Sequence, residues 1–207
     1  MAITHSQYLY TANRLKVEPA TLQAICRVVS GGEGILPDGR PKILFEGHIF
    51  WNQLLNEGIN PEEHVKGNED ILYQYMDKTK YAGDSLEYER QEKASKINKN
   101  AALLSTSYGA FQIMGLNYAL CGFTSIEAFV DSMKEESLQL FAFAQFIQKN
   151  GLLKDLQENN WDNFAYKYGG LAYKENNFAF KLKQQYDYFT SYEKKAAEKF
   201  LKDNIPV

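Results

Sequence analysis

The segment from Val28 to His48 concentrates side chains that could transfer protons around a glycine-rich turn. It contains the carboxylates Glu33 and Glu46, with His48 two residues after Glu46. It also follows an apolar helical pattern, and the negative end of a helix dipole raises the pKa of a carboxyl placed there. Such a carboxyl is suited to act as a general acid, but the chain has Val29 at this helix end. Val29 cannot give or take a proton.

The elements expected around this segment are two helices and a hairpin. Apolar spacing predicts one helix that stops before Pro19 and a second that begins at Pro19 and runs to Val29. Ser30-Gly31-Gly32 breaks the second helix. The next stretch, ILPDGRPKILF, predicts two short extended pieces joined by a Pro-Asp-Gly turn. Residues 48–57 predict another helix.

The remainder of the chain predicts a mainly helical domain. The tract 60–83 is polar and weakly periodic, which indicates a loop-rich segment. Helical spacing then runs through Leu86, Arg90 and Ala94 and continues through AALLSTSYGAFQIMG and LNYAL. We find no repeat or linker. We therefore expect one mainly α domain over residues 1–207 with a small β-hairpin.

Composition excludes several classes of function. The net charge of −3 argues against sequence-independent nucleic-acid binding. The apolar runs are far shorter than the roughly 20 residues that cross a bilayer, and the N-terminus lacks the pattern of a secretory signal. Cys26 and Cys121 read as buried free thiols, and the three histidines have no metal-ligand spacing. We expect no metal and no cofactor.

Several motifs occur together in one order along the chain: Ser30-Gly31-Gly32, Asp38-Gly39-Arg40-Pro41, Leu44-Phe45-Glu46-Gly47-His48, and Ser107-Tyr108-Gly109-Ala110-Phe111-Gln112-Ile113-Met114-Gly115. In this order and spacing, they resemble the N-acetylmuramidase domain of phage endolysins and some type VI secretion effectors. The resemblance extends from Lys16 to Tyr168. It implies a lysozyme-like fold and a glycoside hydrolase that acts on bacterial peptidoglycan.

The chain departs from the family pattern at two positions. The pattern has its catalytic Glu immediately before Ser-Gly-Gly, where this chain has Val29. It has Tyr-Asn-Gly where this chain has Tyr168-Gly169-Gly170, which removes an amide. Three explanations stay open for Val29: a natural noncatalytic relative, an altered copy of an active enzyme, or catalysis by another carboxylate.

Glu46 is the better substitute acid, because the family pattern already has a carboxylate there. The alternative is that Glu46 pairs with Arg40 or His48 and only shapes the site. Glu33, after two glycines, is the weaker candidate, and a solvated turn residue is its favoured interpretation.

The predicted substrate-binding residues come from the hairpin, the FQIMG motif and the C-terminal part: Arg40, His48, Ser107, Tyr108, Gln112 and Tyr168. Arg40 binds either acidic neighbours or the lactyl and peptide parts of peptidoglycan, and His48 either donates to a sugar or is structural. Gln112 is a polar residue in an apolar run, where burying an unpaired amide is costly; a structural Gln is the alternative. The tyrosines could stack on sugars or fill the core.

The leading hypothesis is thus an N-acetylmuramidase, impaired by Val29, whose partner is the glycan strand. The rival is a noncatalytic module, derived from a muramidase, that binds peptidoglycan or recognises a partner. We expect a monomer made in the cytoplasm without a signal peptide. It would act on the cell wall after release through a pore or a secretion system, and an immunity or secretion protein could bind it.

If Val29 replaces the catalytic acid, Val29→Glu should raise muralytic activity by about 10²–10⁴-fold, the usual contribution of general acid–base catalysis. The measurement is the clearing of purified sacculi by the two proteins. A folded Val29→Glu protein that binds glycan and clears sacculi no faster than the parent chain contradicts this prediction.

Overall fold

The computed structural model describes residues 2–170 and 173–204. The chain divides into two compact units. One consists chiefly of Glu33–Lys149, and the other combines Thr4–Gly32 with the described part of Asn150–Val207. The prediction of a single domain stays a prediction, and each unit is considered by itself below.

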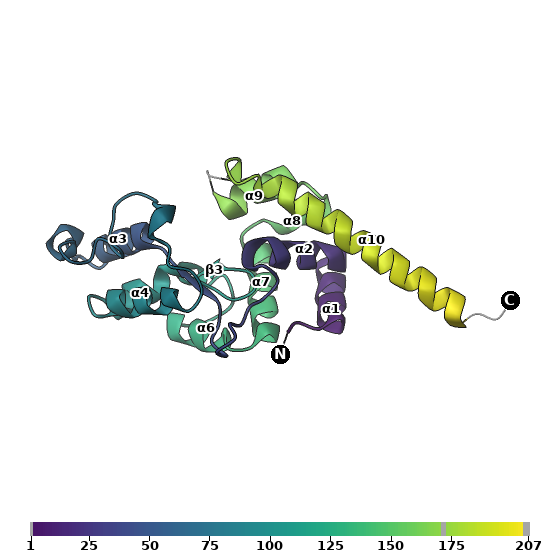
Figure 1. Cartoon of the computed structure of the whole chain (residues 1–207), viewed down its shortest axis with the longest axis horizontal. Coiled ribbons are helices and arrows are strands. Elements are labelled where there is room, and N and C mark those ends of the chain that lie inside the picture. Colours follow the sequence, from purple (N-terminus) through teal and green to yellow (C-terminus); the bar gives the residue numbers. More distant parts are fainter. Residues whose placement is uncertain (1, 171–172, 205–207) are drawn as a thin grey trace. The chain divides into compact units, whose positions relative to one another are not determined.

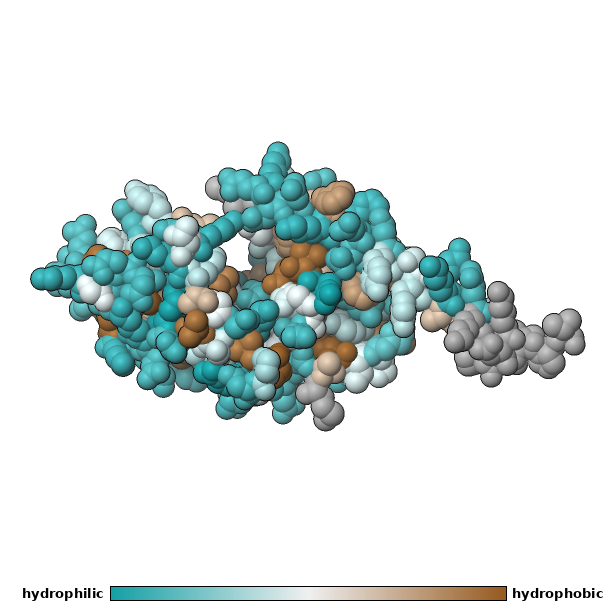
Figure 2. All heavy atoms as spheres, in the orientation of Figure 1, coloured by the Kyte–Doolittle hydropathy of each residue, from teal (hydrophilic) through white to brown (hydrophobic). Residues whose placement is uncertain are grey.

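The first unit combines a small sheet with helices. Its elements in order are β1 (Ile43–Phe45), α3 (Gly47–Asn56), the 3-10 helices Pro61–His64 and Lys78–Lys80, α4 (Leu86–Ser95), α5 (Lys99–Leu104), β2 (Thr106–Tyr108), β3 (Ile113–Met114), the 3-10 helix Gly115–Asn117, α6 (Ile126–Ser132) and α7 (Glu136–Lys149). The antiparallel sheet has the order β1-β2-β3, with Leu44 opposite Ser107 and Ser107 opposite Met114. On the face drawn in Figure 2, the surface over α3 and α4 is mainly hydrophilic.

The predicted hairpin forms around the Pro-Asp-Gly turn, but it is short. The segment around the Pro-Asp-Gly turn makes a single bridge, Ile35 to Pro41, and the turn closes with Leu36 N–H donating to Arg40 O at 2.7 Å. The second extended piece is β1, but its ladder partner is β2, more than sixty residues away in sequence. β1 therefore joins the sheet through long-range pairing.

The helix predicted through AALLSTSYGAFQIMG is wrong after Leu104. There the chain forms β2 and β3, joined by a tight turn. The turn requires left-handed backbone at Gly109 (φ 73°) and Gln112 (φ 48°), which an α-helix excludes. An apolar segment of this length fits either structure, so local spacing could not distinguish them.

A buried glutamine on α7 explains why this turn forms. Gln139 is 1% exposed; its Oε1 accepts from Ala110 N–H at 2.7 Å, and its Nε2 donates to Met133 O at 2.6 Å and to Gly34 O at 3.2 Å. A Cβ at Gly34 or Gly109 would lie under 3 Å from the Gln139 side chain. Both glycines are therefore required for this close approach.

The core of the first unit is aromatic and aliphatic. Phe45, Phe50 and Leu54 pack in one cluster with the fully buried Ile71. Phe111, from the turn before β3, stacks on Phe143 of α7 with ring centroids 4.2 Å apart. These contacts fix β1 and the β2–β3 turn against helices.

The second unit is helical. It contains α1 (His5–Leu15), α2 (Pro19–Ser30), α8 (Leu153–Gln157), α9 (Trp161–Gly169) and α10 (Phe178–Asn204), in which α10 packs against α2 and α9 (Figure 1). As expected, α2 begins at Pro19, and it ends at Gly31 in the left-handed conformation (φ 80°). The predicted fold class, mainly α with a small β element, is confirmed by both units.

Gln139→Leu should lower the free energy of unfolding by about 2–4 kcal/mol, because it leaves the Ala110 N–H and two carbonyls buried without their partner. Urea unfolding measures the change. The matched control is Gln148→Leu on the same helix, where the side chain is exposed and the change should stay within about 0.5 kcal/mol. Equal effects of the two substitutions would contradict the role assigned to Gln139.

Candidate active site

Glu46 lies at the junction of β1 and α3. Its N–H donates to Ser105 O at 2.9 Å, continuing the pairing beside β2, and its carbonyl accepts from Phe50 N–H at 2.9 Å, which begins α3. Its side chain is 11% exposed. The strand thus delivers a carboxyl that is largely shielded from water but still reached by solvent.

Two side chains contact the Glu46 carboxyl. The Tyr81 hydroxyl donates to Oε2 at 2.7 Å, and His48 Nδ1 lies 3.5 Å from the same oxygen. The His48 ring stacks on Tyr73 with centroids 6.4 Å apart. Of the two partners predicted for Glu46, the structure therefore provides His48, while Arg40 binds elsewhere.

Burial raises the pKa of Glu46 above its ordinary value. The hydrogen bond from Tyr81 and the charges of His48 and Arg90 oppose this effect, whereas the Glu87 charge adds to it. Burial and the Glu46 bond also raise the pKa of Tyr81, so its hydroxyl remains a donor. A carboxyl in this setting keeps its proton to higher pH than an exposed one, as a general acid requires.

A buried ion pair on α4 holds the residue that precedes Glu46. Arg90 Nη1 donates to Glu87 Oε2 at 2.6 Å, and these side chains are 6% and 0% exposed. The same guanidinium nitrogen donates to Phe45 O at 2.9 Å, while Glu87 Oε2 accepts from Phe45 N–H at 3.1 Å. The pair therefore holds both backbone groups of the residue before Glu46.

The same pair fixes the segment that carries Tyr81. Glu87 Oε1 accepts from Ala82 N–H at 2.7 Å and from Gly83 N–H at 3.0 Å. Arg90 Nη2 donates to the Tyr73 hydroxyl at 3.3 Å. Both tyrosines near Glu46 are thus positioned through one ion pair.

Arg40 binds an acidic neighbour, Asp38, which is the structural alternative to substrate binding. Its Nε and Nη2 donate to Asp38 Oδ2 at 2.9 and 2.6 Å, and its guanidinium lies 4.0 Å from the centre of the Tyr88 ring. The side chain is 45% exposed. A role for Arg40 in substrate binding stays a prediction.

The predicted residues of β2 and the following turn are engaged with the protein itself. The Ser107 Oγ contacts Met114 Sδ at 3.9 Å, and Tyr108 is 2% exposed with its hydroxyl donating to Leu103 O at 3.1 Å. Gln112 Nε2 donates to Gly109 O at 2.8 Å and to Lys42 O at 3.3 Å. The Tyr108 ring therefore fills the core, and Gln112 holds the turn to the segment before β1.

Val29 and Tyr168 lie in the second unit. Val29 is half-buried in the last turn of α2, next to Ser30, whose Oγ donates to Cys26 O at 2.8 Å. Tyr168 stacks on Phe164 and Phe178, with ring centroids 5.1 and 6.5 Å apart. These positions agree with the predicted helix end but do not test the predicted roles.

Gly169, where the family pattern has Asn, lies close to an aromatic ring. A Cβ at Gly169 would lie 2.9 Å from the Phe178 ring. An Asn side chain would therefore require this ring to move.

Sequence reasoning missed Tyr81, Glu87 and Arg90 as parts of the site. Arg90 did carry a signal, because it occupies an apolar-spaced position on a predicted helix, where a charge needs a buried partner. Tyr81 carried none, since it is one of 14 tyrosines in the whole chain and lies in a weakly periodic tract. Among the described residues, no cluster of three or more His, Cys, Asp or Glu side chains could hold a metal ion.

A mainly helical chain with a small sheet that presents a shielded, hydrogen-bonded carboxyl has the features of the lysozyme-like glycosidases. The chain is a member of the N-acetylmuramidase family, whose model matches residues 18–190. The solved structure of the Burkholderia AP3 phage endolysin is similar over 92% of this chain and 72% of that protein, with 38% identity and a TM-score of 0.80. Comparison with curated proteins gave no match.

The family fixes the class of activity. The match confirms the family resemblance inferred from the motifs. It also confirms the predicted lysozyme-like glycosidase, with peptidoglycan as the substrate class. Within the described ranges, no helix has the length and apolar character to span a membrane.

Tyr81→Phe should raise the pKa of Glu46 further. The hydrogen bond that Tyr81 donates stabilises the ionised carboxylate, and the substitution removes it. Titration of the Glu46 side-chain carbon by NMR measures the shift. Tyr75→Phe, at a tyrosine that is 77% exposed, is the control and should leave the pKa unchanged. An unchanged or lower pKa in Tyr81→Phe contradicts the assigned contact.

Proposed function

We propose that this chain cleaves peptidoglycan glycan strands next to N-acetylmuramic acid, with Glu46 as the general acid and with a rate reduced by Val29. The observation that supports this proposal is the Glu46 carboxyl, buried at the β1–α3 junction within 2.7 Å of the Tyr81 hydroxyl. Its pKa is raised by burial, so a larger fraction is protonated near neutral pH than for an exposed Glu.

The chemistry needs one protonated carboxyl to transfer its proton to the leaving glycosidic oxygen. A second carboxylate commonly activates water or stabilises the oxocarbenium-like transition state. Val29 can do neither. With one of two carboxyls absent, we expect turnover to fall far more than glycan binding, because general acid–base catalysis contributes to the rate and not to ground-state affinity.

For substrate binding, we propose the exposed or half-buried groups of the predicted set. In the first unit these are His48 beside Glu46, Gln112 at the turn after β2, and Arg40 on the 36–40 turn. In the second unit we propose Tyr168. For Ser107 and Tyr108 we propose an indirect role, since the Tyr108 ring is buried: they hold β2 in place, and Gly109 begins the turn that follows this strand.

A second function is favoured by Val29 itself. A muramidase-derived domain that lacks the expected acid could hold glycan or a partner protein without cutting it. The retained Glu46, with its raised pKa and its bond to Tyr81, favours the enzyme.

The finer features of its biology are also proposals. We propose that the protein acts as a monomer and reaches the wall through a lysis pore or a secretion system. An immunity or secretion protein is a further proposed partner. These follow from the family resemblance.

Glu46→Gln should abolish the residual clearing of sacculi by the parent chain, a loss of about 10²-fold or more, because the amide has no acidic proton to transfer to the leaving oxygen. Glu62→Gln, at an exposed carboxylate on the 3-10 helix Pro61–His64, is the charge-matched control. Turbidity gives clearing, and a pull-down on the same sacculi gives binding.

Three results separate the hypotheses. Clearing that survives Glu46→Gln means that Glu46 is not the acid. Binding without clearing, in both the parent chain and Val29→Glu, favours the noncatalytic module. Absence of binding to sacculi by all variants rejects the proposed substrate.

A further inference from the structure

A pocket of about 350 Å³ opens beside the segment that leads into β1. This volume is near the lower end of the range for small-ligand sites, roughly 300–1,000 Å³. Its wall includes Lys42 and the carboxylates of Glu33, Asp38 and Asp84, and its aliphatic part includes Ile35 and Leu36. All of these residues belong to the first unit.

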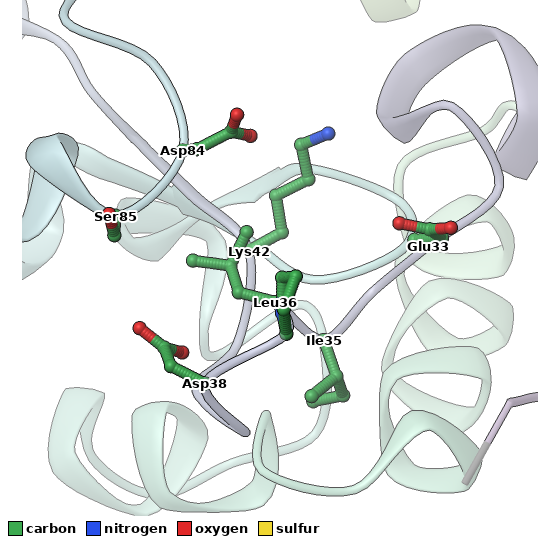
Figure 3. A pocket seen from close by; sticks show the side chains of 8 residues that line it. Glu33, Ile35, Leu36, Asp38, Lys42, Asp84 and Ser85 are labelled. Atoms are coloured by element: carbon green, nitrogen blue, oxygen red, sulfur yellow. The ribbon is translucent and has the colours of Figure 1, made fainter.

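The pocket carries charges of both signs over an apolar base. Figure 3 shows the Lys42 ammonium group between the Asp84 and Glu33 carboxylates, with Leu36 and Ile35 below them. Leu36 is buried, whereas Glu33 and Asp84 are exposed to solvent. The Asp38 carboxylate is already bound by Arg40. Glu33 and Asp84 supply two negative charges beside the single positive charge of Lys42, so a bound cation would be attracted to these two carboxylates.

The lining is better matched to a peptide than to a sugar. No aromatic side chain lines the pocket among the described residues, so it lacks the flat rings on which sugars stack. Clustered charges of both signs complement a ligand that carries both an ammonium group and carboxylates. The peptide stem of peptidoglycan has this character, because its diamino acid supplies the ammonium and its other residues supply carboxylates.

The location agrees with this ligand. Lys42 and Glu46 flank β1, and residues 42, 44 and 46 share one side of the strand because Ile43 and Phe45 are buried on the other. At about 3.3 Å per residue, four residues separate the pocket from Glu46 by about 13 Å. An extended peptide that starts on the lactyl group of the sugar at Glu46 reaches about 10–14 Å by its third or fourth residue. The diamino acid is the third residue of the stem.

We propose that this pocket binds the diamino acid of the peptidoglycan stem, with Glu33 and Asp84 receiving its ammonium group. The inference rests on the proposed function, because it places the glycan at Glu46. The Lys42 charge attracts the stem carboxylates, and the aliphatic part of Leu36 contacts the diamino acid's methylene groups. The pocket thereby makes the protein distinguish stem-bearing glycan from bare glycan.

The test compares two probes with the full chain by calorimetry. One probe is a glycan fragment of alternating N-acetylglucosamine and N-acetylmuramic acid that carries the tetrapeptide stem, and the other is the same fragment after an amidase has removed the stem. The parent chain should bind the stem-bearing fragment about tenfold more tightly, the size expected for two solvent-exposed ion pairs. Lowering the salt concentration should widen the difference.

The double variant Glu33→Gln/Asp84→Asn should lose this tenfold preference and keep the affinity for the bare fragment. The matched control is Glu62→Gln/Glu127→Gln, which removes two exposed carboxylates of the same unit away from the pocket and should keep the preference. Thermal melting checks that both variants fold.

The outcomes separate this inference from the proposed function. If the parent chain binds both fragments equally, or if the double variant retains the preference, the pocket does not bind the stem, although the glycan proposal stands. Equal losses for both fragments in the double variant also reject the stem site. If the parent chain binds neither fragment, the proposed function fails and the inference with it.

Discussion

The site depends on the buried ion pair between Glu87 and Arg90. Burying two charges costs several kcal/mol per ion unless hydrogen bonds satisfy them. Here both charges are engaged with the backbone of Phe45, and Glu87 also accepts from Ala82 and Gly83. The pair therefore aligns the end of β1, from which Glu46 projects, with the segment that presents Tyr81. Losing one partner would leave the other charge buried and disturb both segments.

This arrangement also sets the electrostatics of the candidate acid. Burial raises the pKa of Glu46, while the nearby Arg90 charge and the Tyr81 hydrogen bond moderate the rise. A general acid works best when its pKa lies near the working pH, and a pKa raised above the ordinary value of a Glu is a shift in that direction. The ion pair thus links positioning and proton affinity. Both depend on α4, so the shape of the candidate site is decided by residues that are almost fully buried.

Local signals in the sequence predicted several elements correctly and one region wrongly. Pro19 and Gly31 set the ends of α2, because proline fits a first helical turn and glycine allows the left-handed residue that ends a helix. The 105–114 segment was predicted as helix but forms β2 and β3. Its turn is determined by Gln139, which binds Ala110 from 29 residues away. A spacing pattern cannot represent such a partner.

The sequence by itself determined the family and the mainly helical class, and it singled out Glu46 and Val29 as candidate site positions. These are encoded in residue types at fixed positions along the chain. Only the tertiary structure decided that Glu46 binds Tyr81 rather than Arg40, that Arg40 binds Asp38, and that Tyr108 is a core residue. The physical reason is that a side chain's hydrogen-bond partners and burial depend on which segments pack together. For Glu46, the partner lies 35 residues away in sequence and is held there by the buried ion pair.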